Sequence, residues 1–391
     1  MLQIYTDKRT PEILKTLRKI GKEVIAPHAG DVDKNARFPS EALEALKAEK
    51  LLSAYVPKEY GGMGFTISDL AVICETLAHY CGSTAMVFAL HQIQVACMVH
   101  HGKSSKFFCD YMSEIVEKQT LFASATTEIG IGGDLGSSLC AVKVTGTNYT
   151  LEKQAPVISY GAHADAILVT CRKSEEAQKN DQAFVLVKQK DCTLTPLSSW
   201  DTLGFRGTCS LGFALTSHGH ADQIVPTPFA QILNQTMHPV AHILWASLWL
   251  GISADAVDRA RSVVREAARK NPDTPPISAL RLAEADAVLF SMRGGLSETL
   301  CDYHLKLQNN DMDGLESFGF ALRVNNLKVT SSQMLIDIVS RAMIICGISG
   351  YKNDSKSSLC RHLRDAYGAS VMVNNDRILN YNASLQIIYK S

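Results

Sequence analysis

The apolar residues of the first 120 positions recur every three or four residues, which is the period of an α-helix. The first helix is expected to start at Thr10-Pro11-Glu12, because proline is favoured in a first helical turn. The same period predicts helices at about 40–51, 68–80, 85–100 and 105–118, with Ser68-Asp69 as a cap for the third. Residues 56–64 hold a proline and three glycines and are expected to form a loop.

From Leu121 to about Ile224 the pattern changes to short alternating runs separated by Gly, Asn and Asp, which predicts strands at 141–144, 149–151, 166–171 and 183–187. After Pro228 the helical period returns, at about 231–270, 277–308, 314–346 and 354–372. We therefore expect a multidomain α+β protein. Its parts are an N-terminal α-helical domain (1–120), a middle antiparallel β-barrel or sandwich (121–226) and a C-terminal four-helix bundle (227–391).

Composition excludes several classes of protein. Lys+Arg and Asp+Glu both number 39, so no net charge favours nucleic acid or an anionic membrane. The 11 cysteines are scattered without a CxxC or His/Cys cluster, which indicates reduced thiols, no metal site and a cytoplasmic location. No signal peptide is visible, and no run of about 18 apolar residues predicts a membrane span.

The segment Ser124–Ser138, SATTEIGIGGDLGSS, holds four glycines within seven residues. Glycine lets a backbone approach a ligand closely, and the hydroxyls of Thr126, Thr127 and Ser137 can hydrogen-bond a flat heterocycle or a phosphate. A flexible surface turn is the alternative interpretation. The segment has neither the GK[ST] of a P-loop nor the GxGxxG of a Rossmann site, so a cofactor held here implies another architecture.

Several motifs, in register along nearly the whole chain, resemble the acyl-CoA dehydrogenase family. They are VPKEYGGMG at 56–64, Thr127-Glu128 with the glycine run, VISYGAHAD at 157–165, WDTLGFRGTCS at 200–210, and Gly347, Gly350 and Tyr351 with Arg361, Arg364 and Asp365. The resemblance implies FAD between the middle domain and the bundle, or FMN if the chain belongs to the monooxygenases of this fold. It also implies oxidation of an acyl thioester at the Cα–Cβ bond.

The resemblance carries cofactor roles to individual positions. Thr127 falls where a threonine contacts the flavin, Gly132 and Gly133 where the pyrophosphate is held, and Ser159 near the reactive edge of the ring. Val157 replaces a tryptophan that shields one side of the ring. The full set of expected cofactor contacts is Thr126, Thr127, Gly132, Gly133, Val157, Ser159, Arg269, Gly347 and Asn375; Arg269 would keep the charge of an arginine that reaches the cofactor of a neighbouring subunit.

The family's catalytic glutamate is missing. The resemblance places Val373 at its usual position and Ala241 at the alternative one, and neither side chain accepts a proton. His242, beside the second position, and Asp376, three residues after the first, are candidate replacements. His91 with Ser159 resembles a pair in flavin monooxygenases of this fold. The alternatives are a core or helix-surface histidine for His242 and a capping loop for Asp376.

Three functions therefore stay open. They are an acyl-CoA dehydrogenase with a relocated base, a flavin-dependent monooxygenase that uses reduced flavin and oxygen, and a non-catalytic flavin- or acyl-binding protein. The implied partners are an acyl-CoA or carrier-bound substrate, an electron-transfer flavoprotein or flavin reductase, and further copies of the chain in a homodimer or homotetramer.

Overall fold

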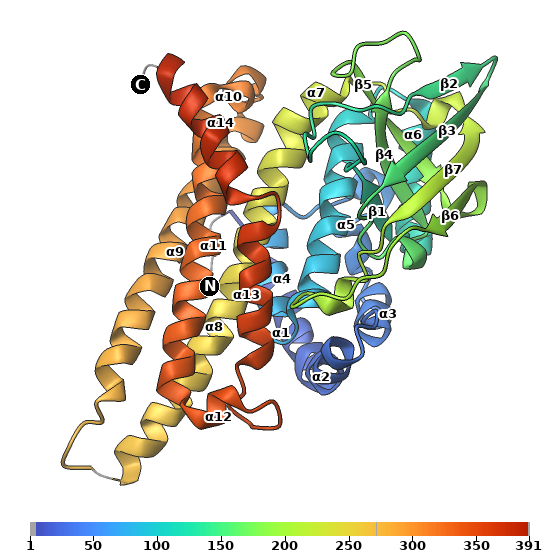
Figure 1. Ribbon diagram of the computed structural model, residues 1–391. Helices are drawn as coiled ribbons and strands as arrows, with labels where there is room; N and C mark the ends of the chain where they lie inside the picture. Colours follow the sequence, from blue (N-terminus) through green and yellow to red (C-terminus); the bar gives the residue numbers. More distant parts are fainter. Residues whose placement is uncertain (1–4, 271, 390–391) are drawn as a thin grey trace.

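The computed structural model describes residues 5–270 and 272–389, which form a helical region, a region of two sheets and a long helical bundle (Figure 1). The first region begins with one rod in which a π-helical turn, η1 (Gly21–Ile25), joins two helices. Its helices are α1 (Thr10–Ile20), α2 (Ala26–Lys34), α3 (Ser40–Ala48), α4 (Ile67–Ala78), α5 (Gly82–His101) and α6 (Lys106–Lys118), with 3-10 turns η2 (Leu51–Ser53) and η3 (Lys58–Tyr60).

The start of α4 differs from the expected cap. Thr66 is the N-cap, because its hydroxyl accepts from the Asp69 amide while the Asp69 carboxylate accepts from the Thr66 amide. Ser68 lies inside the helix, so the Ser68-Asp69 cap was wrong by two residues. Asp69 also accepts a hydrogen bond from the Thr10 hydroxyl, and this bond ties α1 to α4.

The middle region is a sandwich of two sheets. One has the order β1-β4-β5 and the other β2-β3-β7-β6. The strands are β1 (Phe122–Ala125), β2 (Val142–Thr145), β3 (Asn148–Ala155), β4 (Ala166–Arg172), β5 (Gln182–Lys188), β6 (Cys192–Pro196) and β7 (Phe213–His220). Four 3-10 turns lie in its loops: η4 (Gly161–His163), η5 (Gln189–Asp191), η6 (Arg206–Thr208) and η7 (Ala221–Gln223). The expectation of a wholly antiparallel domain is wrong at one pair, because β1 and β4 run parallel.

The C-terminal region starts with α7 (Phe229–Ile232) and a π-helical turn, η8 (Leu233–Met237). Its other helices are α8 (His238–Lys270), α9 (Ser278–Gln308), α10 (Met312–Glu316), α11 (Phe318–Cys346), α12 (Ile348–Tyr351), α13 (Cys360–Val371) and α14 (Asn375–Ile388). Helix α8 packs on α4 so closely that a Cβ at Gly251 would lie 2.2 Å from the Glu75 carbonyl oxygen. Helix α14 was not predicted; the Asn374 side chain caps it by accepting from the Asp376 amide.

Three helical segments are long and apolar enough to cross a membrane by length and composition: α5, Phe229–Lys270 and α11. Within the fold, 94%, 94% and 50% of their most apolar windows are buried. Much of the hydrophobicity of α5 and α8 is therefore used in the protein interior.

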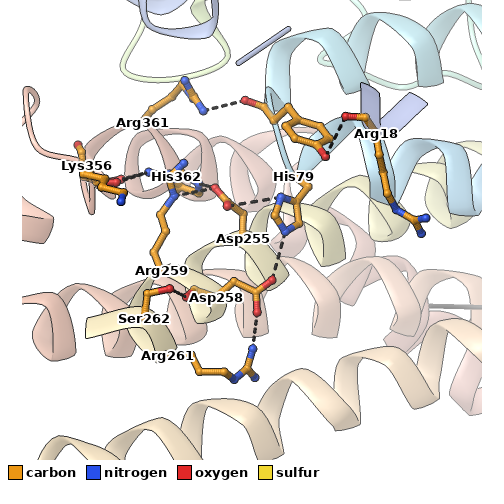
Figure 2. A network of polar contacts seen from close by, with 12 residues as sticks. Arg18, His79, Asp255, Asp258, Arg259, Arg261, Ser262, Lys356, Arg361 and His362 are labelled. Atoms are coloured by element: carbon orange, nitrogen blue, oxygen red, sulfur yellow. Dashed lines mark hydrogen bonds and ion pairs between the residues drawn. The ribbon is translucent and has the colours of Figure 1, made fainter. Parts of the chain in front are cut away.

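A buried polar network fixes α13 on α8 and on the N-terminal region (Figure 2). Asp255 Oδ2 lies 2.6 Å from His362 Nε2 and 2.8 Å from Arg259 Nε, and Arg361 donates to the Tyr80 carbonyl. Burial alone would raise the pKa of Asp255, but the hydrogen bond with His362 and the nearby guanidinium of Arg259 hold that pKa well below its usual range. The network fixes the start of α13, which leads to Val373.

Candidate functional site

The middle region and the bundle meet at the loop that contains Gly204. A Cβ at Gly204 would lie 2.3 Å from the Arg364 carbonyl oxygen, so only glycine permits this approach. The Phe205 amide donates to Asp365 Oδ1 at 2.6 Å, and the Trp200 indole donates to the Phe205 carbonyl. The WDTLGFRGTCS and RxxRD segments, far apart in sequence, therefore form one contact.

The glycine loop has the backbone geometry that its composition suggests. Gly130, Gly132 and Gly133 have φ values of 96°, 60° and 79°, a region that glycine adopts without the strain that other residues incur. The base of the loop is closed by Glu128, whose carboxylate accepts from the amides of Leu139 (2.9 Å) and Cys140 (2.7 Å). The segment is therefore a held loop and not a free surface turn.

Lys153 on β3 neutralises Glu128 from inside the sandwich. Its side chain is fully buried, its Nζ lies 3.8 Å from Glu128 Oε2, and it donates to the Thr170 carbonyl at 2.7 Å. Burial lowers the pKa of Lys153. Sequence analysis missed this pair, although a lysine among the inward positions of an alternating strand is a signal that reveals it.

The N-terminus of α14 closes over the glycine loop. Arg377 Nη1 donates to the Gly132 carbonyl at 3.0 Å, and a Cβ at Gly133 would lie 2.5 Å from the same nitrogen. A glycine loop, an arginine and the positive end of a 14-residue helix therefore converge. This combination binds phosphate groups in many proteins. Arg377 was missed because nothing in its local sequence distinguishes it from a surface arginine.

The residues expected beside the ring lie together on the middle region. Thr127 Oγ1 donates to the Val157 carbonyl at 3.2 Å, and Ser210 Oγ donates to Ser159 Oγ at 2.9 Å. The Thr126 carbonyl accepts from Thr170. Val157 itself is 38% exposed. Small hydroxyls beside an uncovered apolar side chain suit the edge and face of a flat heterocycle.

Several known proteins resemble this chain in sequence or in fold. The family model for the N-terminal domain of acyl-CoA dehydrogenases matches residues 8–106. A probable acyl-CoA dehydrogenase, YngJ of Bacillus subtilis, is 22% identical over 369 residues, which is 92% of each chain. The butyryl-CoA dehydrogenase structure from Megasphaera elsdenii superposes with a TM-score of 0.83 at 18% identity, over 97% of this chain and 98% of that one.

This chain has the acyl-CoA dehydrogenase fold. The match confirms the resemblance that the motifs indicated. The same fold is shared with FMN-bound TdsC of Paenibacillus sp. A11-2, at a TM-score of 0.82 and 16% identity, over 97% of this chain and 98% of that one. A structure of TdsC is described as a dibenzothiophene monooxygenase.

The resemblance to acyl-CoA dehydrogenases assigned two positions to a catalytic base, and these positions differ in burial. Val373 is 37% exposed and has φ of 54°, which is unusual for a β-branched residue, and Asn374 follows at φ of 29°. This strained pair turns the chain between α13 and α14. Ala241 is buried inside α8.

The three candidate bases are placed very differently. His91 is fully buried: its Nε2–H donates to the Leu52 carbonyl at 2.7 Å and its Nδ1 accepts from the Phe122 amide at 3.0 Å. Both ring nitrogens are therefore used by the backbone, and the Ser159 hydroxyl accepts from Ser210, not from His91. Burial lowers the pKa of His91 to about 4, so the ring is neutral.

His242 lies inside the bundle, where its Nδ1 lies 3.2 Å from the Val324 carbonyl and its ring packs edge-on against His238. Burial and the neighbouring His238 hold the pKa of His242 well below its ordinary value. Asp376, in contrast, is exposed in the first turn of α14. Of the three candidates, only Asp376 is on the surface.

Asn375 rests on a buried lysine of α11. Lys328 Nζ donates to Asn375 Oδ1 at 2.6 Å, and Asn375 Nδ2 donates to Ser332 Oγ at 3.0 Å. Burial lowers the pKa of Lys328 to about 8. These bonds fix the start of α14 and hence the position of Arg377.

Two expected cofactor contacts lie outside this cluster. Arg269 is in the last turn of α8, at the hairpin end of the bundle that points away from the middle region (Figure 1). Gly347 follows the C-terminal end of α11 and has φ of 58°. Neither residue reaches the glycine loop of its own chain. Among the described residues, no group of three or more His, Cys, Asp or Glu is arranged to hold a metal ion.

Asp365 gives the junction a measurable pH dependence. Burial raises its pKa to about 6, against a smaller lowering by the Phe205 amide. Because the folded state holds this proton more tightly than the unfolded state, its contribution to stability is complete below about pH 4 and is lost as the pH rises to about 6. A shift of two units corresponds to at most about 3 kcal/mol.

We expect Asp365→Asn to flatten the fall in unfolding free energy between pH 4.5 and 6.5 and to stabilise the protein at pH 8 by about 1–3 kcal/mol. Thermal and urea unfolding across this range measure the effect. Asp354→Asn, at an exposed position, is the control and should leave the profile unchanged. Equal pH profiles for wild type and Asp365→Asn would contradict the buried-proton account.

Proposed function

We propose that this protein is a flavin-dependent oxidoreductase that oxidises an acyl thioester at the Cα–Cβ bond. The observation that carries the proposal is the site formed by the glycine loop, Arg377 and the Thr127–Val157–Ser159 surface. This donor set fits a flavin: an arginine and a helix N-terminus for its phosphates, and hydroxyls and an apolar face for its ring. FAD is the proposed cofactor, with FMN as the alternative.

The residues of this chain have separable tasks in such a site. Arg377 and the amides of Gly132 and Gly133 would hold the phosphates, and Thr127 and Ser159 would orient the ring. A bound flavin supplies the acceptor for the hydride that leaves the β-carbon. The chain must supply an acceptor for the α-proton. We assign this role to Asp376, because the ring nitrogens of His91 are bonded to backbone and His242 is buried in the bundle.

A monooxygenase is the second candidate function. Val157 leaves one side of the proposed ring site uncovered, and Val373 offers no carboxylate. Reduced flavin and oxygen would then be the co-reactants, with a flavin reductase as partner. If the protein is a dehydrogenase, an electron-transfer flavoprotein would reoxidise the flavin. We propose that the protein is cytoplasmic, whichever of the two functions it has.

The bundle also offers a surface for self-association. Large apolar side chains are exposed along α9, α11, α12 and α14: Ile277, Leu280, Phe290, Ile344, Ile348, Tyr351, Tyr381, Ile387 and Ile388. Apolar patches of this kind commonly mark protein interfaces. We propose that another copy covers them in a homodimer or homotetramer. Arg269, at the end of α8 where the chain turns into α9, would then face a neighbouring subunit.

Anaerobic titration of the FAD-saturated protein with acyl thioesters tests the function. A dehydrogenase should lose its oxidised-flavin absorbance with butyryl-CoA or a cyclic acyl-CoA. No bleaching, together with substrate oxygenation when reduced flavin and oxygen are added, would favour the monooxygenase. Bound flavin without either reaction would support a binding protein.

Arg377→Gln should weaken FAD binding about 10- to 100-fold, because a charge-assisted hydrogen bond contributes roughly 1.5–3 kcal/mol. Quenching of flavin fluorescence on binding measures the affinity. Arg341→Gln, on α11 and paired with Asp337 and Glu284, is the matched control. Unchanged affinity in Arg377→Gln would remove the phosphate site from the proposal.

A further inference from the structure

A cavity of about 360 Å³ lies between the start of α4, the end of α5 and the end of α9. His100, near the end of α5, is one of its lining residues. None of the residues that line the cavity belongs to the proposed flavin site at Gly132, Val157 and Arg377. The two sites are therefore formed by different residues.

Aromatic rings dominate the wall of this cavity. Tyr55, Phe65 and Tyr303 are buried, and the rings of His100 and His304 also line it. Aromatic side chains pack favourably against the faces and edges of other rings. The wall therefore favours a flat, aromatic occupant.

One buried hydroxyl in the wall has no partner. Ser68 is 2% exposed, and its Oγ makes no hydrogen bond within the described residues. A buried hydroxyl without a partner is unfavourable, because it has lost its hydrogen bonds to water. The neighbouring polar groups are already used, because the Tyr55 hydroxyl lies 2.7 Å from His100 Nε2 and the Tyr303 hydroxyl donates to the Gln235 carbonyl. Ser68 is thus available to an occupant.

Among the described residues, the lining contains no Lys, Arg, Asp or Glu. Burial lowers the pKa of His100 to about 3 and also lowers the pKa of His304. The carboxylate of Asp69, which follows the lining residue Ser68, already accepts hydrogen bonds from Asp7, Thr10 and Thr66. An uncharged ligand avoids the desolvation penalty that an ion would meet here.

Tyr5 contacts two residues that line the cavity. The Tyr5 ring stacks on His304 with centroids 4.2 Å apart, and the Tyr5 carbonyl accepts from the Thr66 hydroxyl at 3.1 Å. Tyr5 therefore links α9 to the residue that caps α4.

We propose that this cavity binds an uncharged, planar aromatic molecule of about two fused rings, whose hydroxyl or carbonyl group bonds to Ser68. The size follows from the volume, since a cavity of about 150 Å³ accommodates a single benzene ring. The bond to Ser68 satisfies the one free hydroxyl of the wall. Nothing in this binding requires the flavin chemistry.

Titration of the full-length, FAD-saturated protein with 2-naphthol tests the proposal. Calorimetry should show saturable binding, and 2-naphthalenesulfonate, of similar shape but charged, should bind at least tenfold more weakly. Leu300→Trp, which fills the cavity, should weaken 2-naphthol binding at least tenfold. Leu280→Trp, the same residue at an exposed position of α9, should leave it unchanged.

Ser68→Ala provides a second variant that does not crowd the core. It should weaken 2-naphthol binding about five- to tenfold without altering the binding of naphthalene, which has no hydroxyl group. The proposal fails if 2-naphthol does not bind, if the sulfonate binds equally well, or if Ser68→Ala and Leu300→Trp both bind like wild type. A crystal structure in which 2-naphthol lies at the proposed flavin site instead of beside Ser68 would also overturn the proposal.

Discussion

Asp376→Asn is expected to slow anaerobic flavin reduction by an acyl thioester about 10²–10⁴-fold, the usual loss when a general base is removed. Asn has nearly the same shape and keeps the polar group in the first turn of α14, but it cannot accept the α-proton. FAD affinity should stay within a few fold of wild type, because Arg377 and the glycine loop are untouched. Stopped-flow absorbance and flavin titration measure the two quantities separately.

Two further measurements separate a catalytic role from a structural one. Added formate should restore part of the lost rate. Asp313→Asn, the same change in the first turn of α10, should have no effect on flavin reduction. A wild-type rate in Asp376→Asn would show that the proton leaves by another route.

Lys153→Met should be the most damaging single change to stability, at about 3–5 kcal/mol, because it leaves the buried carboxylate of Glu128 without its cation. Glu128→Gln should also destabilise, since the buried ammonium of Lys153 then loses its anion and the amides of Leu139 and Cys140 lose a charged acceptor. Melting temperature and urea midpoints measure both effects.

The double variant tests whether the two residues act as a pair. Lys153→Met with Glu128→Gln should cost less than the sum of the single changes, by about 1–3 kcal/mol of coupling. Lys143→Met on β2 removes an exposed ion pair with Glu175 and should cost less than about 1 kcal/mol. Additive effects of the two buried changes would show that Lys153 stabilises the sandwich independently of the glycine loop.

The sequence was sufficient for the order of the three regions, because long amphipathic helices and alternating strands leave strong periodic patterns. The family motifs also placed Thr127 beside Val157, and these two residues are hydrogen-bonded; their contact with a flavin stays a prediction. Helix α14 was missed because Asn374-Asn375-Asp376 has the composition of a turn. Here the same residues cap and begin a helix.

The contacts that sequence analysis missed join residues that are distant in sequence. Arg377 and Gly132 are 245 residues apart, and Asp365 and Phe205 are 160 apart, so no local pattern reveals either contact. His91 illustrates the opposite case. A histidine on an apolar helix is chemically versatile, and only the tertiary structure shows that the backbone of Leu52 and Phe122 uses both of its ring nitrogens.

At the contact between Gly204 and Arg364, the middle region and the bundle pack directly against each other. A flavin bound between Val157 and Arg377 would contact both the middle region and the bundle. Ligand that binds only the assembled form raises the temperature at which both halves come apart. The empty protein should therefore melt at a lower temperature than the protein loaded with flavin.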